Sequence, residues 1–273
     1  MSGSGEYDES MSFWQHLEVL RKVLWKALFA VVVIAVAAFV FKDALFSMVF
    51  APSRGDFVTY RLLCRLAELT GWHGLCASDF QAAFINTELA AQFMTHVKVS
   101  LWTGVCLASP YIIYLLYGFV APALYEKEKR YSGIVIFSSV ALFVAGVLLN
   151  YFVIFPFSFR FLSMYQVQPE VVNQIALSSY ISTFLLLSLL LGVMFELPVL
   201  AYILAKMGVL RADALRKYRK HAFVGICILA AVITPTGDAV TLMIVTLPVY
   251  LLYELSIAVV GRVEKKRRQN DSV

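Results

Sequence analysis

Charged residues are scarce in this sequence. Asp, Glu, Lys and Arg make up 15% of the 273 residues, while 60% of the chain is hydrophobic. A typical soluble domain carries about 25% charged residues. The shortage of charge and the mean hydropathy of +0.77 therefore exclude an ordinary soluble domain and predict an all-α polytopic membrane protein.

Recognisable catalytic and cofactor motifs are also lacking. The chain contains no phosphate-binding loop, no glycine-rich dinucleotide turn and no nucleophile–base pair that we can place. Its four histidines are scattered, which argues against a metal site. We therefore expect neither an enzyme nor a cofactor. The net charge of +5 does not indicate nucleic acid, because the basic residues fall in short segments between apolar runs.

Long apolar runs dominate what is present. We expect a small, polar, disordered tail (1–11), one membrane domain (12–261) and a basic tail (262–273). The membrane domain begins either with an amphipathic helix at the membrane surface or with the solvated start of the first helix. The fifth apolar run is short, so it forms with the sixth either a re-entrant hairpin or two short spans in a thinned bilayer. The six predicted spans are 23–49, 99–120, 131–159, 180–205, 222–234 and 239–260.

Lys and Arg are distributed unevenly between the two sides of this predicted arrangement. Seventeen of the 23 basic residues fall on the side of the N-terminus. Because basic residues accumulate in cytoplasmic loops, both termini are predicted to be cytoplasmic. The opposite side holds six: Lys42, Arg54, Arg61, Arg65, Lys98 and Arg160.

A single ionisable residue, Glu196, interrupts the fourth run and is followed by Pro198. A carboxylate is costly in lipid, so Glu196 should face protein or water and be protonated or paired. Pro198 has no amide hydrogen, so the carbonyl of Met194 loses its helical partner and a kink is expected beside the acid. Glu196 is either a polar docking point, a proton-sensitive site, or a carboxyl that simply bonds a neighbouring span.

The predicted topology places two of the four cysteines inside spans and two in an outer loop. Cys106 and Cys227 lie in apolar runs and are expected to be buried thiols. Cys64 and Cys76 share the loop that follows the first span, which the predicted topology places outside the cell. In an oxidising compartment these two either form a disulfide or remain free thiols.

Six sequence segments together resemble the TatC family, the multi-spanning receptor subunit of the twin-arginine protein translocase. The resemblance covers about residues 12–261. It implies six helices curved around a concave face, both termini cytoplasmic, in the bacterial inner membrane, with the fifth and sixth runs as two short spans. The segments are SFWQHLEVLR, FVAPALYEKEKR, FVIFPFSFRF, FELPV, ITPTGD and LPVYLLYELS.

The resemblance implies a binding site for twin-arginine signal peptides on the cytoplasmic face. Glu128 of YEKEKR occupies the acidic position of the loop that follows the second span, and a carboxylate there suits a guanidinium pair. The family's N-terminal motif reads HL-x-ELR. Here Val19 stands where the glutamate is expected, so Glu18 faces a different direction on the helix. The implied signal-peptide contacts are Glu128, Glu18, Arg21, Phe119 and Leu124.

The resemblance also implies contacts with other subunits. Glu196 matches the family's intramembrane glutamate and would contact a single-span TatA- or TatB-type partner or the inserted signal peptide. Thr234, Asp238 and Thr241 would belong to the partner-docking surface, where Thr241-Leu242 replaces the family's Ser-Gln. Self-association and contact with the lipid bilayer are expected as well.

Two functions compete at this point. The first is a non-enzymatic receptor core of a protein-export translocase that works under the proton-motive force. The second is a proton-coupled small-solute transporter that uses Glu196 as its carrier site. We find no internal repeat of the kind that such transporters often carry, which favours the translocase.

Overall fold

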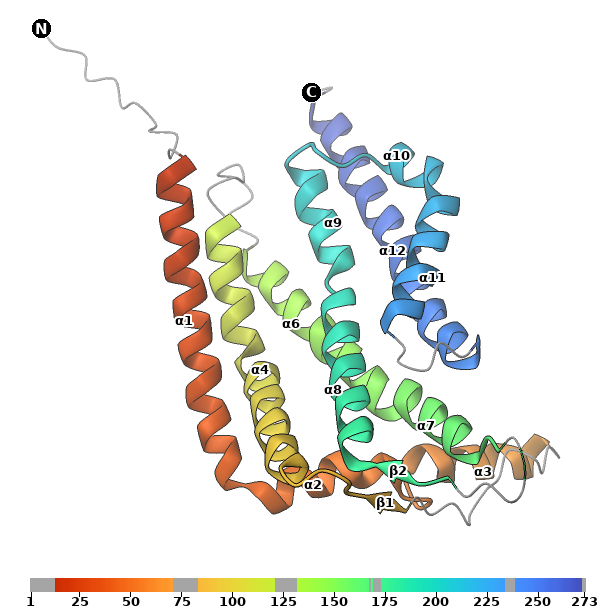
Figure 1. Ribbon diagram of the computed structural model, residues 1–273. Helices are drawn as coiled ribbons and strands as arrows, with labels where there is room; N and C mark the ends of the chain where they lie inside the picture. Colours follow the sequence, from red (N-terminus) through yellow and green to blue (C-terminus); the bar gives the residue numbers. More distant parts are fainter. Residues whose placement is uncertain are drawn as a thin grey trace, which may run out of the picture.

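Helices make up nearly all of the regular structure (Figure 1). The computed structural model describes residues 13–70, 83–120, 132–166, 168, 173–233 and 239–271. Within these ranges the elements are α1 (Phe13–Val40), α2 (Lys42–Phe50), a 3-10 turn η1 (Ala51–Ser53), α3 (Val58–Thr70), β1 (Phe84–Ile85), α4 (Ala91–Val120), α6 (Ser132–Leu149), a π-helical turn η4 (Asn150–Ile154), α7 (Phe155–Met164), β2 (Ile175–Ala176), α8 (Leu177–Met194), α9 (Leu197–Lys206), α10 (Ala212–Lys217), α11 (Arg219–Ile233) and α12 (Ala239–Asp271).

Five helical segments of the described chain are long and apolar enough to cross a membrane, as predicted for five of the six runs. The predicted fifth run lies in α11, which has only 15 residues and is shorter than the other candidate spans. The five candidates are Trp14–Val40, Ala91–Val120, Gly133–Met164, Leu177–Lys206 and Ala239–Gln269.

Helices α1 and α4 form a closely packed pair (Figure 1). Their approach depends on Gly104 of α4. A Cβ atom at this position would lie 2.7 Å from the carbonyl oxygen of Val31 and 2.9 Å from the Cβ of Ala35, both on α1. No side chain larger than hydrogen fits there without moving one of the helices, so Gly104 sets the distance between them.

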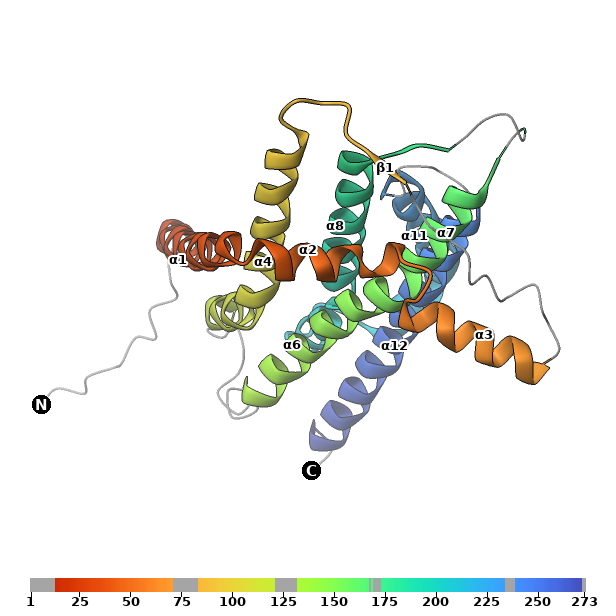
Figure 2. The same ribbon diagram turned by 90° about the horizontal axis from the view of Figure 1, so that it is seen from below.

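The predicted first span, 23–49, contains a break that the sequence analysis did not foresee. Helix α1 ends at Val40, and α2 starts at Lys42 and runs across the ends of the other helices (Figure 2). Two tyrosines fix α2 in this direction. The hydroxyl of Tyr151 donates to the carbonyl of Met48, and that of Tyr180 to the carbonyl of Val49, both at 2.9 Å. These bonds tie the last turn of α2 to η4 and α8; the carbonyl of Met48 also accepts the backbone N–H of Ala51.

Prolines inside the spans leave carbonyls that hydroxyl groups then satisfy. Pro110 deprives the Cys106 carbonyl of its helical donor, and the Ser109 hydroxyl donates to that oxygen at 2.7 Å. Pro156 does the same to the Phe152 carbonyl, which accepts a hydrogen bond from the Thr59 hydroxyl. The second bond joins α3 to the long α6–α7 segment. The loop predicted to follow the first span thus contains the helix α3, which packs against this segment.

The predicted kink beside Glu196 is confirmed. Helix α8 ends at Met194, Phe195 and Glu196 form a turn, and α9 starts at Leu197 with Pro198 as its second residue. Proline fits the first turn of a helix because its missing N–H would have no partner there. The break thus follows from the sequence itself and places Glu196 at the joint between two helices.

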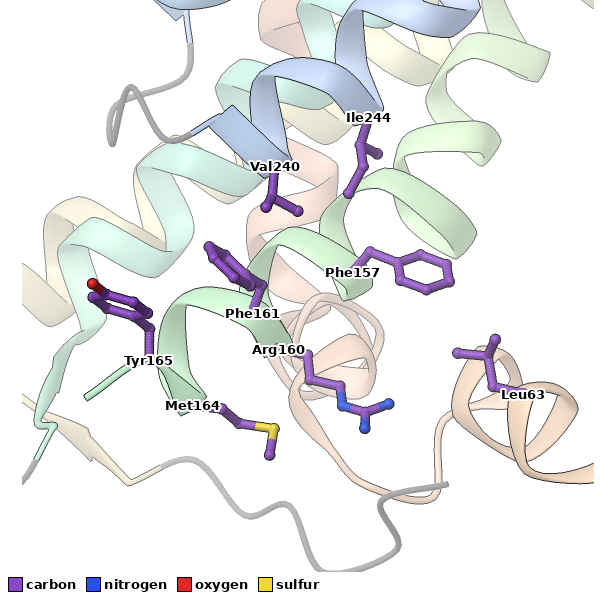
Figure 3. Close-up of a pocket in the computed structure, with 8 residues that line it drawn as sticks. All are labelled: Leu63, Phe157, Arg160, Phe161, Met164, Tyr165, Val240 and Ile244. Atoms are coloured by element: carbon purple, nitrogen blue, oxygen red, sulfur yellow. The ribbon is translucent and has the colours of Figure 1, made fainter. Parts of the chain in front are cut away.

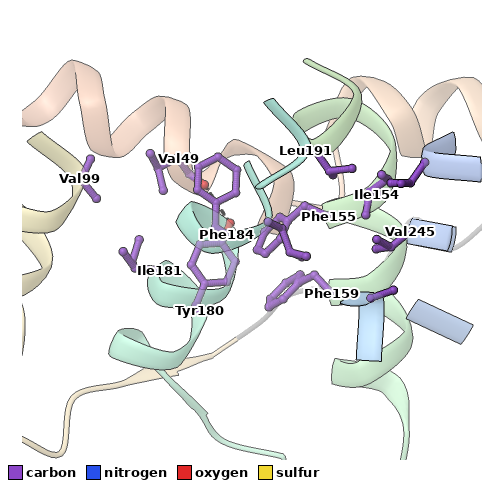
Figure 4. Close-up of a cluster of buried hydrophobic side chains, with 13 residues drawn as sticks. Val49, Val99, Ile154, Phe155, Phe159, Tyr180, Ile181, Phe184, Leu191 and Val245 are labelled. Atoms are coloured by element: carbon purple, nitrogen blue, oxygen red, sulfur yellow. Dashed lines mark hydrogen bonds between the residues drawn. The ribbon is translucent and has the colours of Figure 1, made fainter. Parts of the chain in front are cut away.

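The larger of two clusters of buried hydrophobic side chains among the described residues lies where α2, α7 and α8 meet, on the side away from the start of α1 and the end of α12 (Figure 4). Phe155 is its centre. The ring centroids of Phe159, Tyr180 and Phe184 lie 5.8, 5.1 and 4.9 Å from that of Phe155. A short parallel pairing of β1 with β2 lies on the same side, with Phe84 opposite Ile175.

Candidate functional site

The starting end of α1 and the final turn of α4 lie side by side (Figure 1). His16 and Phe119 stack there, with ring centroids 4.1 Å apart and an angle of 27° between the planes. His16 belongs to the N-terminal motif, and Phe119 opens the segment FVAPALYEKEKR. The fold therefore joins two motifs that lie about a hundred residues apart in the sequence.

The charged residues of the N-terminal motif, Glu18 and Arg21, are exposed. Glu18 pairs with Lys22 one turn further along α1, with 2.8 Å between Oε1 and Nζ, and both side chains are more than half exposed. Val19, three positions from His16, is half-buried, and Arg21 is exposed. An exposed ion pair stabilises a helix only slightly. Glu18 can therefore exchange Lys22 for another cation at little cost.

Several predicted site residues lie outside the described part of the chain. These are Leu124 and Glu128 in the segment between α4 and α6, Thr234 and Asp238 between α11 and α12, and Cys76 after α3. Their roles stay predictions.

The remaining three cysteines are described. Cys106 and Cys227 are free thiols, both half-buried. Cys64 lies in α3 and is disulfide-bonded. The pairing of Cys64 with Cys76 stays a prediction, which alkylation mass shifts with and without reductant would check.

Glu196 lies at the joint between α8 and α9 and faces α6. The Ser139 hydroxyl of α6 donates to Oε2 of its carboxyl group. The other oxygen, Oε1, is buried and has no hydrogen-bond partner among the described residues. A buried polar atom without a partner is costly. Glu196 is therefore tied to one neighbouring span, and its second, buried oxygen has hydrogen-bonding capacity that the described residues do not use.

Thr241, the described member of the predicted docking surface, is buried. Thr241 is the third residue of α12 and is 2% exposed. Thr241 is thus not on the molecular surface, unlike its neighbour Val240, which is exposed.

An ion pair that sequence reasoning missed connects α11 to α12. Nη2 of Arg219 lies 2.7 Å from Oε2 of Glu254, and the Tyr250 hydroxyl donates to the other carboxyl oxygen at 3.1 Å. The signal was present in the sequence, because an acid inside an apolar run needs a partner. The sequence could not show which of the many basic residues nearby would supply it.

Metal binding receives no support from the described residues, in which no group of three or more His, Cys, Asp and Glu side chains could hold an ion.

The described residues instead offer two kinds of polar contact. One is an exposed rim at the ends of α1 and α4, and the other is a carboxyl group at a helix joint inside a span. Both suit the capture of a peptide or helix that approaches from the membrane.

Known proteins resemble this chain over nearly its whole length. The family model for the Sec-independent protein translocase protein (TatC) matches residues 15–248. A TatC protein of Blattabacterium sp. subsp. Periplaneta americana is 34% identical over 260 residues, which is 94% of this chain and 97% of that protein. A TatC protein of Carboxydothermus hydrogenoformans is 32% identical over 260 residues, 95% of this chain and 96% of its own.

The structural comparison agrees. A crystal structure of the twin arginine translocase receptor TatC superimposes with a TM-score of 0.73 and 28% identity, covering 91% of this chain and 99% of that one. The six segments singled out in the sequence, the five candidate spans and these similarities all point the same way, toward protein transport and away from a small-solute transporter. The chain is a membrane protein that belongs to the TatC family of Sec-independent protein translocase proteins.

Proposed function

We propose that this chain is the receptor core of a twin-arginine translocase. In this proposal it binds the twin-arginine signal peptides of folded precursors and recruits single-span partners of the TatA or TatB type. The observation that carries the proposal is the stack of His16 on Phe119, which joins the N-terminal motif to the start of the loop segment containing Glu128. Two separate sequence motifs then contribute to one rim.

The orientation we propose places this rim in the cytoplasm of a bacterial cell. Described basic residues gather at the ends of the helices on this side, including Arg21, Lys206 and Arg219. In a bacterial inner membrane this excess favours cytoplasmic termini. The proposal also makes α11 a sixth span. Its 15 residues extend about 22 Å, so the bilayer would be locally thin there.

The binding chemistry we propose rests on carboxylates near the membrane surface. Two adjacent guanidinium groups need acceptors, and a bidentate carboxylate is the strongest available. Glu128 would be the principal acceptor. Glu18 would be secondary, because it is already paired with Lys22. Arg21, Phe119 and Leu124 would shape the rim.

Glu196 would serve the hydrophobic part of the guest. A helix that lies against the joint of α8 and α9 would donate a hydrogen bond to the unpartnered Oε1 once a small movement of the joint uncovers this buried atom. The guest would be either the inserted signal peptide or the membrane helix of a partner. Thr234 and Asp238 would contact partners at the start of α12, while the buried Thr241 would support that end of the helix.

Charge reversal at Glu128 tests the binding site. In membranes containing the variant Glu128→Lys, we expect chemical cross-linking to a twin-arginine precursor to disappear, because the guanidinium groups would meet a cation. Membrane insertion, followed by protease accessibility, should stay normal.

The matched control is Asp213→Lys, which reverses an exposed acid on α10 at the same end of the molecule. Cross-linking should persist in this variant. Normal cross-linking with Glu128→Lys would exclude Glu128 from the site, and its loss in both variants would mean that general charge controls binding.

A further inference from the structure

Helix α3 leaves the bundle sideways at the end of the molecule where α4 and α8 start (Figure 1 and Figure 2). It extends past α7 and lies across the direction of the candidate spans. Its 13 residues span about 20 Å, too short to cross a hydrocarbon core of about 30 Å. The helix therefore lies beside the membrane core and does not cross it.

One side of α3 is held by the protein. The Thr59 hydroxyl bonds to the α6–α7 segment, and the hydroxyl of the buried Tyr60 lies 2.9 Å from the carbonyl oxygen of Pro156. Burial raises the pKa of Tyr60 to about 12, so the phenol keeps the proton that it donates. Ala67 is buried as well, and Leu63 lines a cavity of about 450 Å³ whose other walls come mainly from α7 and the start of α12 (Figure 3). Contacts within the chain thus fix α3 and its orientation.

A second apolar stripe on α3, formed by Val58, Leu62 and Leu69, is uncovered. These side chains are 53%, 57% and 83% exposed. Successive residues of a helix are about 100° apart, so the three lie within roughly 40° of one another and roughly opposite Ala67. The apolar part of α3 is thus wider than the part that packs against the protein. Apolar surface left in water is costly, so the uncovered stripe requires an apolar cover from outside the described chain.

Charged residues flank the uncovered stripe along one edge. Arg61, Arg65 and Glu68 are exposed, and their positions on the helix all fall on the same edge of the stripe. Arginine can lay its hydrocarbon stem along an apolar surface while its guanidinium group reaches water or phosphate. An apolar stripe with a mostly basic edge is typical of a helix that lies in the headgroup region of a membrane. The charge pattern therefore favours phospholipid as the cover of the stripe over an apolar protein surface.

The level of α3 matches the boundary between headgroups and acyl chains. The candidate spans that start at Ala91 and Leu177 begin at this end of the molecule, and the one over Gly133–Met164 ends there. The last of these has 32 residues, which extend about 48 Å. This exceeds the roughly 30 Å of hydrocarbon, so the segment crosses the membrane obliquely, as it lies in Figure 1. Helix α3 is fastened to the end of this oblique segment.

We propose that α3 is an interfacial anchor in the leaflet on its side of the molecule. The uncovered stripe lies against the upper acyl chains, and the two arginines lie among the lipid phosphates. Because Thr59 and Tyr60 bind α3 to the α6–α7 segment, the anchor holds the end of this oblique span at a fixed depth. The anchor does not require signal-peptide binding, so it and the proposed receptor function can fail separately.

Fluorescence quenching in lipid nanodiscs tests this position. The full-length protein is reconstituted in phosphatidylcholine and phosphatidylglycerol, with a fluorescent amino acid at one position at a time. The stripe positions Val58, Leu62 and Leu69 are compared with Arg61 and Glu68 as matched controls, and all five are exposed. The quenchers are a lipid that carries a nitroxide high on its acyl chain, and aqueous iodide. We expect the ratio of lipid to iodide quenching to be roughly fivefold higher at the stripe positions than at the controls.

Two outcomes would overturn the anchor. Equal ratios at the stripe and control positions would mean that α3 has no side that faces lipid. Protection of the stripe from both quenchers would mean that a second copy of the chain or another protein covers it.

A carboxylate placed in the stripe gives a second test. With the probe at Leu69, the variant Leu62→Asp should raise iodide quenching about threefold, because the new charge draws the helix toward water. Leu62 is exposed, so the fold should persist, which circular dichroism checks. The control Glu68→Asp keeps its carboxylate on the charged edge and should leave the quenching at Leu69 unchanged. An unchanged value in Leu62→Asp would contradict lipid contact at the stripe.

Discussion

Two carboxyl groups inside the candidate spans are held in different ways. Glu254, near the middle of α12, has its charge compensated by Arg219 and a further hydrogen bond from Tyr250. Glu196, at the joint of α8 and α9, receives a hydrogen bond from the Ser139 hydroxyl only, and one oxygen stays buried without a partner among the described residues. The first acid is satisfied within the chain. The second keeps one buried oxygen whose hydrogen-bonding capacity is unused within the described chain.

The difference shows that an acidic residue in an apolar run can have one of two roles, a structural one or a binding one. A fully partnered acid joins helices, as Glu254 joins α12 to α11. A partly satisfied acid is a site that retains part of its hydrogen-bonding capacity, and such groups inside membranes are commonly functional. The two roles can be told apart only by the hydrogen-bond and ion-pair partners of the carboxyl group, and the sequence does not reveal these partners.

The largest effect is expected from reversing the charge of Glu254. Glu254→Arg places two guanidinium groups together, and we expect the free energy of unfolding to fall by roughly 2 kcal/mol or more, because a charge deprived of its partner is costly even when half-exposed. Thermal unfolding in detergent measures this. The swapped pair Arg219→Glu with Glu254→Arg should recover most of the loss. If the swap is no better than the single variant, the pair does not join the helices.

A functional effect with little loss of stability is expected from Glu196→Gln. The amide can still accept a hydrogen bond from Ser139, so the free energy of unfolding should change by about 1 kcal/mol or less. Cross-linking to a signal peptide or partner helix within the bilayer should fall about tenfold, because the amide accepts a weaker bond than a carboxyl group does.

Glu254→Gln is the matched control, and it should show the opposite behaviour, with lower stability and intact cross-linking. Equal behaviour of the two variants would remove the distinction between the acids. Export at the normal rate with Glu196→Gln would make Glu196 a packing residue.

The smallest effect is expected from Ser139→Ala. Loss of this hydroxyl removes one hydrogen bond and leaves both carboxyl oxygens of Glu196 for an external donor. We expect about 1 kcal/mol less stability and guest cross-linking at or above the normal level, measured by the same two assays. Reduced cross-linking would show that Ser139 positions Glu196 for the guest.

The sequence predicts those features of the fold that depend on residues close together in the chain. The break beside Glu196 follows from Pro198, because a missing N–H affects the chain within one turn. The long apolar helices followed from runs of spanning length. The paired motifs were recognisable as motifs, but their contact through His16 and Phe119 required the fold.

Other features depend on residues far apart in the sequence. Nothing in the run 23–49 breaks a helix, since it has neither glycine nor proline, yet the chain turns at Phe41. Tyrosines 103 and 131 residues away donate hydrogen bonds to the carbonyls of Met48 and Val49 and so fix the new direction. The α3 helix is likewise fastened by Thr59 to a carbonyl that Pro156 had left unpaired. The spacing of apolar residues along the sequence cannot predict such long-range hydrogen bonds.

Gly104 controls a region that it does not touch. The stacked rings of His16 and Phe119 lie fifteen residues further along each helix from the contact between Gly104 and Val31, about 22 Å away. A single methyl group added in the middle of the membrane would wedge the two helices apart and separate the rings at their tips. The geometry of the proposed signal-peptide rim is therefore decided partly by one absent side chain in the middle of α4.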